Sequence, residues 1–264
     1  MTKMIYIPPF QMLPEPSIGT AFRHLMLPHL INSPRYSNFF SKVADQGQYI
    51  ILDNGKAEGE QVPDKKLAGI AWSYRVSEIV LPDSMGDPEE TEALARGFLS
   101  EWRSTLPVRT KIGYVLHGRT SHEIELTYEK LRSYKRLYDI IDVLYIPRSV
   151  ITAEQPRARV DAAGYILNTE NHPLPIHFLG ASVEAIDEGK WIRDGLGGRI
   201  RSMDTSAPFV YALRGAYIND GSRIKRDIDT YFTSMWDEGK RHVAKKNCAI
   251  MDAWIGTSKS ALEV

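Results

Sequence analysis

The stretch KIGYVLHGRTSHEIELTYEKL, residues 111–131, combines two patterns that decide the fold. Its first part, residues 111–118, is largely apolar, which is typical of a strand buried on both faces of a parallel sheet. Thr120 or Ser121 can then cap a helix that we expect to run to about Tyr134. A second apolar run follows at residues 142–147, so the segment predicts a strand–helix–strand unit.

The same unit recurs along the chain. Other apolar runs that predict strands lie at residues 4–8, 49–53, 78–83, 175–180 and 199–204. The segments between them are helical in pattern; in one, Asp87 is the expected N-cap, Pro88 the first helical residue and Glu90 the partner in a capping box. This alternation in 264 residues predicts an α/β fold, a (β/α)₈ TIM-type barrel, rather than an open sheet. The eighth strand is not evident, and residues 209–214 are one candidate.

Composition limits the classes of protein that remain. We expect a single domain over residues 1–264, with a C-terminal helical segment at about 222–264. Lys plus Arg and Asp plus Glu both number 33, so a nucleic-acid ligand would require basic residues gathered on one face. The single cysteine, Cys248, excludes an internal disulfide and a cysteine-cluster metal site. No apolar run is long enough for a membrane span, and we expect a cytoplasmic protein.

Polar residues follow several of the predicted strands, where a β/α barrel carries its chemistry. Carboxylates stand in LDNG (Asp53), LPDS (Asp83) and MDTS (Asp204). An isolated Asp after a strand is usually a helix cap or a turn former, and this reading is strongest for Asp83, because Asp87 lies nearby. Three acids at the mouth of one barrel would repel one another, and such an arrangement indicates a functional site.

These motifs, in this order, resemble the tRNA-guanine transglycosylase superfamily. The order is LDNG, VLPD, a strand that ends in a polar residue plus glycine, FLG and MDTS, over roughly residues 51–208. The chain is most similar to the phage and bacterial DNA-guanine transglycosylases, which place 7-deazaguanines in DNA. If the protein is phage-encoded, the expected cytoplasm is that of a bacterial host. The resemblance implies that the enzyme exchanges guanine for a free 7-deazaguanine base, preQ0 or a close relative.

The resemblance also implies roles for individual residues. Asp204 would be the catalytic nucleophile and Asp53 the general acid/base, while Asp83 would bind the guanine-like face of the base. His117 stands where the family usually has a base-binding glutamine, and the remaining expected base-binding positions are Gly118 and Gly180.

The expected chemistry explains why acids are needed. A carboxylate can attack C1′ and hold the sugar covalently while one base leaves and another enters. A second carboxyl group can protonate the leaving base, and a third can accept bidentately from N1–H and the exocyclic amine of guanine. The zinc site of the tRNA-acting members needs three cysteines and a histidine, and this chain has only Cys248, with His242 nearby. We therefore expect no metal and no cofactor.

The expected macromolecular partner is DNA. Transfer to tRNA by the same chemistry is the alternative, and a non-catalytic barrel that binds nucleic acid is a third reading. No membrane partner is expected, and the oligomeric state is open. Candidate phosphate contacts are Arg148, Arg199, Arg201, Arg223, Lys225 and Arg226. The C-terminal basic residues alternate with acids, as on a solvated helix face, which is the competing interpretation.

Overall fold

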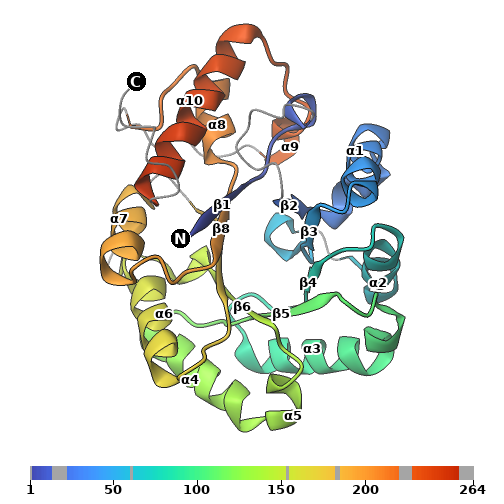
Figure 1. Cartoon of the computed structure of the whole chain (residues 1–264), viewed down its shortest axis with the longest axis vertical. Coiled ribbons are helices and arrows are strands. Elements are labelled where there is room, and N and C mark those ends of the chain that lie inside the picture. The colour runs from blue at the N-terminus through green and yellow to red at the C-terminus, as the bar shows by residue number, and fades with distance from the viewer. Residues whose placement is uncertain are drawn as a thin grey trace. The chain divides into compact units, whose positions relative to one another are not determined.

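The computed structural model describes residues 2–13, 23–59, 62–152, 155–181, 185–219 and 228–255. Eight strands form one parallel sheet in the order β1-β8-β7-β6-β5-β4-β3-β2, and helices lie between them in the chain (Figure 1). This is the topology of a TIM-type (β/α)₈ barrel, so the fold class predicted from the sequence is confirmed.

Each of the seven predicted apolar runs overlaps a strand of the structure. The strands are β1 (Lys3–Tyr6), β2 (Arg23–Met26), β3 (Tyr49–Leu52), β4 (Glu78–Val80), β5 (Lys111–Val115), β6 (Val143–Pro147), β7 (Ile176–Leu179) and β8 (Ser202–Thr205). The strand that the sequence did not reveal is β2, which begins with Arg23 and His24 and pairs with β3. The candidate at residues 209–214 is wrong. It lies in α8 (Ala207–Leu213), a helix buried almost all round, and such a helix has no polar face to distinguish it from a buried strand.

The helices have the following bounds. The longer ones are α1 (Pro34–Asp45), α2 (Asp64–Ser73), α3 (Pro88–Trp102), α4 (Ser121–Ser133), α6 (Ala158–Thr169), α7 (Ala185–Gly195) and α10 (Glu238–Trp254). The short ones are α5 (Lys135–Tyr138), α9 (Ile228–Tyr231) and the 3₁₀ turns η1 (Phe10–Met12), η2 (Pro28–Asn32), η3 (Lys56–Glu58), η4 (Arg103–Thr105) and η5 (Arg148–Val150). Within the expected C-terminal segment lie α9 and α10. Among the described residues, none of the helices has the length and apolar character that a membrane crossing requires.

The chain divides into two compact units, Arg23–His177 and Met1–Phe22 with Phe178–Val264. We call them the central unit and the terminal unit, and each is described by itself. The single-domain organisation expected from the sequence stays a prediction.

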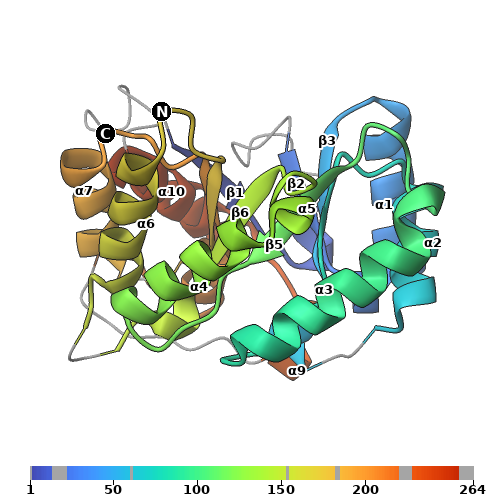
Figure 2. The same ribbon diagram turned by 90° about the horizontal axis from the view of Figure 1, so that it is seen from below.

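The central unit contains β2 to β6 and α1 to α6. Its strands pair in parallel register, for example Leu25 with Ile51 and Ile79 with Ile112. Figure 2 shows α4 and α6 side by side, and the two helices are in contact. Glu78 is fully buried at the start of β4, where the hydroxyl groups of Tyr49 and Tyr145 donate to its carboxylate. A buried carboxylate is tolerated here because it has hydrogen-bond donors.

The helix starts follow the sequence signals, with one difference. Asp87 caps α3 by accepting from the backbone N–H groups of Glu89 and Glu90, at 3.0 and 2.9 Å. Thr120 caps α4 through the N–H of Glu123 at 3.1 Å. The expected capping box at Glu90 is wrong, because the Asp87 N–H donates to the Ser84 carbonyl and the Glu90 carboxylate accepts from the Ser84 hydroxyl. Ser84, in the loop before α3, therefore binds both the Asp87 N–H and the Glu90 carboxylate, two groups that would bond to each other in a capping box.

The terminal unit is built around β1 and β8, which pair in register from Lys3 with Ser202 to Tyr6 with Thr205. Helices α8 and α10 pack against each other (Figure 1). Between them, fully buried Asn247 accepts from the Ile218 N–H at 2.9 Å and donates to the Pro208 carbonyl at 3.1 Å. These contacts fix α8, the helix that directly follows β8 and its aspartate.

Candidate functional site

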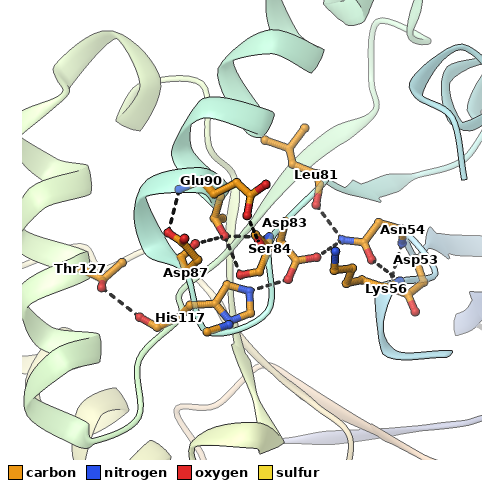
Figure 3. A network of polar contacts seen from close by, with 12 residues as sticks. Asp53, Asn54, Lys56, Leu81, Asp83, Ser84, Asp87, Glu90, His117 and Thr127 are labelled. Carbon is orange, nitrogen blue, oxygen red and sulfur yellow. Dashed lines mark hydrogen bonds and ion pairs between the residues drawn. The ribbon is translucent and has the colours of Figure 1, made fainter. Parts of the chain in front are cut away.

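The predicted site residues are distributed over both units. The central unit holds Asp53, Asp83, His117, Gly118 and Arg148, and the terminal unit holds Gly180, Arg199, Arg201 and Asp204. The structure brings the first three into one hydrogen-bonded network (Figure 3), and it brings Gly180 to Asp204. The predicted phosphate contacts Arg223, Lys225 and Arg226 lie outside the described residues.

Asp53 follows β3 directly and is only 8% exposed. Its backbone N–H donates to the Met26 carbonyl at 2.9 Å, so the residue continues the pairing of β3 with β2. Its carboxylate accepts from the Asn54 N–H at 2.8 Å, and the Asn54 carbonyl oxygen Oδ1 accepts from the Lys56 N–H at 3.0 Å. Gly55 between them has φ +82°, a conformation that glycine adopts without strain. The LDNG motif is thus a tight turn that places an acid and an amide at the carboxyl end of β3.

Asp83 lies at the centre of the network after β4 (Figure 3). Its Oδ1 accepts from the side-chain amide of Asn54 at 2.6 Å, and the same amide donates to the Leu81 carbonyl at 2.8 Å. Its Oδ2 is hydrogen-bonded to Nε2 of His117, and the side chain is 8% exposed. The sequence did not single out Asn54, although the LDNG motif contains it. An asparagine directly after a candidate acid was the available signal.

The contacts of His117 determine which ring nitrogen carries the proton. The Gly86 N–H donates to Nδ1 at 3.3 Å, so Nδ1 presents a lone pair. The proton is therefore assigned to Nε2, which donates to Asp83. The imidazole is 2% exposed, and the Thr127 hydroxyl holds the His117 carbonyl at 2.9 Å. Both ring nitrogens have protein partners, whereas the sequence-based prediction, which stays untested, gives one of them to a base.

The loop between β4 and α3 is fixed on both sides of Met85. The Ser84 N–H donates to the Thr91 hydroxyl at 2.9 Å, and that hydroxyl donates to the Asp87 carbonyl at 2.7 Å. Gly86 has φ +77° and points its N–H at His117. The loop that follows Asp83 is thus part of the same structure that orients His117.

Gly118 has a packing reason to be glycine. A Cβ at this position would lie 2.8 Å from the backbone nitrogen of Ile124 and 3.0 Å from Cβ of Glu123, in the first turn of α4. Side chains do not approach so closely, so only glycine allows α4 to begin this near to His117. Base binding by Gly118 stays a prediction.

A small pocket of about 90 Å³ adjoins Asp83 on the side of α2 and α3. Its polar lining is Asn54, Lys56, Asp64, Asp83 and Glu90, and its apolar lining is Val62, Leu67, Pro82 and Leu94. Burial and the nearby Glu101 carboxylate raise the pKa of Asp64. The pocket therefore places one lysine and two further acids, Asp64 and Glu90, beside Asp83, the central carboxylate of the network.

In the terminal unit, Asp204 lies within β8 and is 4% exposed. Its Oδ2 accepts from the Gly180 N–H at 3.1 Å, and its backbone carbonyl accepts from the Ala181 N–H at 2.6 Å. Gly180 has φ +70° at the end of β7, and this left-handed conformation turns its N–H toward the acid. Thr205 donates from its hydroxyl to the Ala181 carbonyl at 2.8 Å, which ties the two strand ends together. Asp204 is thus a buried carboxylate fixed by a backbone donor.

The basic candidates differ in their placement. Arg148 follows β6 and is exposed at the carboxyl end of that strand, as a contact near the site requires. Arg199 and Arg201 precede β8, so they stand at the end of that strand opposite to Asp204. This position does not favour them as phosphate contacts beside the nucleophile, and their role stays a prediction.

Within the described ranges, no group of three histidine, cysteine or acidic side chains is arranged to hold a metal ion. Cys248 is buried in α10, and burial raises the pKa of its thiol well above the ordinary value.

Comparison with known proteins identifies no family for the chain. No protein-family model matches it, and neither does any curated protein. Solved structures that match the chain include the CBM22-1–GH10 modules of endo-1,4-β-D-xylanase 10B from Clostridium thermocellum with xylohexaose, at 8% identity and a TM-score of 0.48. That match covers 78% of this chain, which spans 59% of the xylanase chain. A thermostable mutant of xylanase Xyn10A from Cellvibrio japonicus matches at 9% identity and a TM-score of 0.49, over 97% of this chain and 98% of the other. At this level of similarity neither structure bears on the activity.

Proposed function

We propose that the protein is a DNA-guanine transglycosylase that exchanges guanine in DNA for a free 7-deazaguanine base. The observation that carries the proposal is the network of Asn54, Asp83 and His117 (Figure 3). It holds a buried carboxylate as a hydrogen-bond acceptor at the carboxyl end of β4, beside the second buried acid Asp53. Such an acceptor suits the N1–H and exocyclic amine of a guanine-type ring. The order of the sequence motifs, which resembles that of the transglycosylases, supports the same reaction.

In the proposed reaction, Asp204 attacks C1′ of the target nucleotide. A bond forms between its carboxylate oxygen and C1′ while the C1′–N9 bond breaks, and the electron pair leaves with the guanine, which Asp53 protonates. The incoming base then gives a proton to Asp53 and attacks C1′, which releases Asp204 as a carboxylate. The Gly180 N–H that holds Asp204 at 3.1 Å stabilises this carboxylate as the leaving group.

The substrate requires access to a base that is normally stacked. A guanine in duplex DNA would be flipped out or met in single-stranded form. Arg148, exposed after β6, is the described candidate for a phosphate contact at the carboxyl end of the strands. The proposal requires Asp53 and Asp204 to act on a single glycosidic bond, and the variants below test this requirement.

The decisive experiment incubates the protein with DNA and free preQ0, or with other 7-deazaguanines, and then measures modified deoxynucleosides by mass spectrometry. Asp204→Asn keeps the size of the side chain and removes the nucleophile, so the covalent protein–DNA adduct and the product should both disappear. Asp53→Asn should slow turnover by a factor of about 10² or more. The control is Asp194→Asn, an exposed α7 acid paired with Arg193, which should retain full activity.

The same assay with tRNA in place of DNA separates the two nucleic-acid substrates. Exchange only in tRNA would assign the chemistry to tRNA. Absence of exchange in both nucleic acids, with every 7-deazaguanine tested, would overturn the proposed function. Binding of DNA without exchange would support a non-catalytic role for the barrel.

A further inference from the structure

Both ring nitrogens of His117 are hydrogen-bonded to other residues of the protein. Its ring is almost completely buried, its Nδ1 accepts from the Gly86 N–H, and its Nε2 is bonded to Asp83. Neither nitrogen is directed to solvent or to a ligand in this arrangement. The imidazole can therefore influence a bound ligand through the carboxylate of Asp83, to which it is hydrogen-bonded.

Asp83 keeps acceptor capacity after these contacts. Each of its oxygens accepts one protein hydrogen bond, Oδ1 from Asn54 and Oδ2 from His117. A carboxylate oxygen has two lone pairs, so each can accept one further N–H. The two protein donors also fix the plane of the carboxylate, because one binds each oxygen. A ligand with two adjacent N–H groups would meet both oxygens in a geometry already set before binding.

We propose that His117 is a positioning residue that, together with Asn54, holds the Asp83 side chain in place as an acceptor of two N–H groups. The inference that the selected ligand is a guanine-type base rests on the proposed function. The state of the Asp83–His117 pair does not depend on it.

The hydrogen bonds of His117 determine which of its nitrogens faces Asp83 as a donor. The Gly86 N–H occupies the lone pair of Nδ1 at 3.3 Å, so the N–H of the ring is the one on Nε2. Asp83 therefore meets a donor on each oxygen, Asn54 on Oδ1 and His117 on Oδ2, and presents only acceptor positions to a ligand. A ring edge that presents an acceptor to Asp83 leaves two buried acceptors facing each other without a donor, and such ligands are rejected.

The first test reads the tautomer directly and needs no activity. In protein labelled with ¹⁵N at histidine, long-range ¹H–¹⁵N spectra at neutral pH should show His117 as the neutral Nε2–H tautomer. The spectrum of the His117→Gln variant, which lacks one of the seven histidine signals, assigns the resonance. The neutral Nδ1–H tautomer, which has no proton on Nε2 to donate to Asp83, would overturn the inference.

The second test compares His117→Gln with His117→Asn by steady-state kinetics for the free base. The longer glutamine amide can reach Asp83 as a donor, whereas the asparagine amide is too short. Because a hydrogen bond to a charged group is lost, His117→Asn should raise KM for the base at least about tenfold and change kcat less than about threefold. His117→Gln should stay within about threefold of the wild type.

Equal loss in both variants, or no loss in either, would overturn the role of the Nε2 donor. A purely structural role would lower kcat and raise KM together in both variants, with a matching fall in melting temperature. If no base exchange is found with any nucleic acid, the proposed function fails. The tautomer still decides whether His117 positions Asp83 as an acceptor.

Discussion

Replacement of Gly113 by alanine adds a single methyl group, and this group should disturb the packing in the interior of the central unit. The new Cβ would lie 2.3 Å from Cε2 of Tyr145, 2.9 Å from its Cδ2 and 3.2 Å from the Ile79 carbonyl oxygen. Carbon atoms in contact prefer separations of about 3.5–4.0 Å, so the ring must move by roughly 1 Å or more. Tyr145 is fully buried and its hydroxyl donates to fully buried Glu78, so this movement weakens that hydrogen bond.

The cost has two parts. Overpacking of a close-packed interior costs about 1–3 kcal/mol, and a weakened hydrogen bond to a buried carboxylate adds about 1–3 kcal/mol. Glu78 keeps its bond from Tyr49 at 2.6 Å, which places the second part at its lower end. We expect a total loss of about 2–4 kcal/mol in the free energy of unfolding. For a chain of this size that corresponds to a fall of roughly 5–15 °C in melting temperature.

Thermal unfolding followed by circular dichroism measures the effect. The matched control is Gly69→Ala on α2, where a Cβ meets nothing within 4 Å, and which should stabilise the protein by about 0.5–1 kcal/mol. If the ring contact is the cause, Gly113→Ala should cost less in the Tyr145→Leu background. A melting temperature within about 1 °C of the wild type for Gly113→Ala would refute the reasoning, as would an equal cost in both backgrounds.

Three further outcomes are expected. Asp87→Ala should cost about 1 kcal/mol because it removes the N-cap of α3, whereas Asp87→Ser should restore most of this stability in urea unfolding. Gly118→Ala should cost about 1–3 kcal/mol, because its Cβ would displace the backbone of Ile124 in the first turn of α4; unchanged melting would show that the turn yields freely. Burial lowers the pKa of His24 despite its hydrogen bond to Gln48, so the folded form holds it neutral. The stability that neutral His24 contributes is fully present above about pH 6.5 and is lost as pH falls through the lowered pKa of the folded form. His24→Leu should therefore lose less free energy of unfolding on acidification, measured by urea unfolding at several pH values. The same dependence on pH in variant and wild type would contradict this.

The sequence was sufficient for most of the fold, because its signals are local. Runs such as residues 142–147 must be buried on both faces, and Asp87 and Thr120 mark helix starts through their own backbone geometry. The signals failed where local composition misleads. The second strand begins with Arg23 and His24 and lacks an apolar pattern, whereas α8 is apolar on every side and resembles a strand. In both cases tertiary burial, rather than local preference, selects the conformation.

For the site, the sequence by itself determined the candidate acids and their order, since a carboxylate directly after an apolar run must emerge where a strand ends. Tertiary structure alone decided their partners. Asn54 and His117 meet Asp83 from the ends of β3 and β5, and Gly180 meets Asp204 from the end of β7. Hydrogen bonds between residues far apart in the chain depend on how neighbouring strands are aligned and, for His117, on the loop that directs the Gly86 N–H toward its ring. No local pattern of residues specifies the strand alignment or the path of that loop.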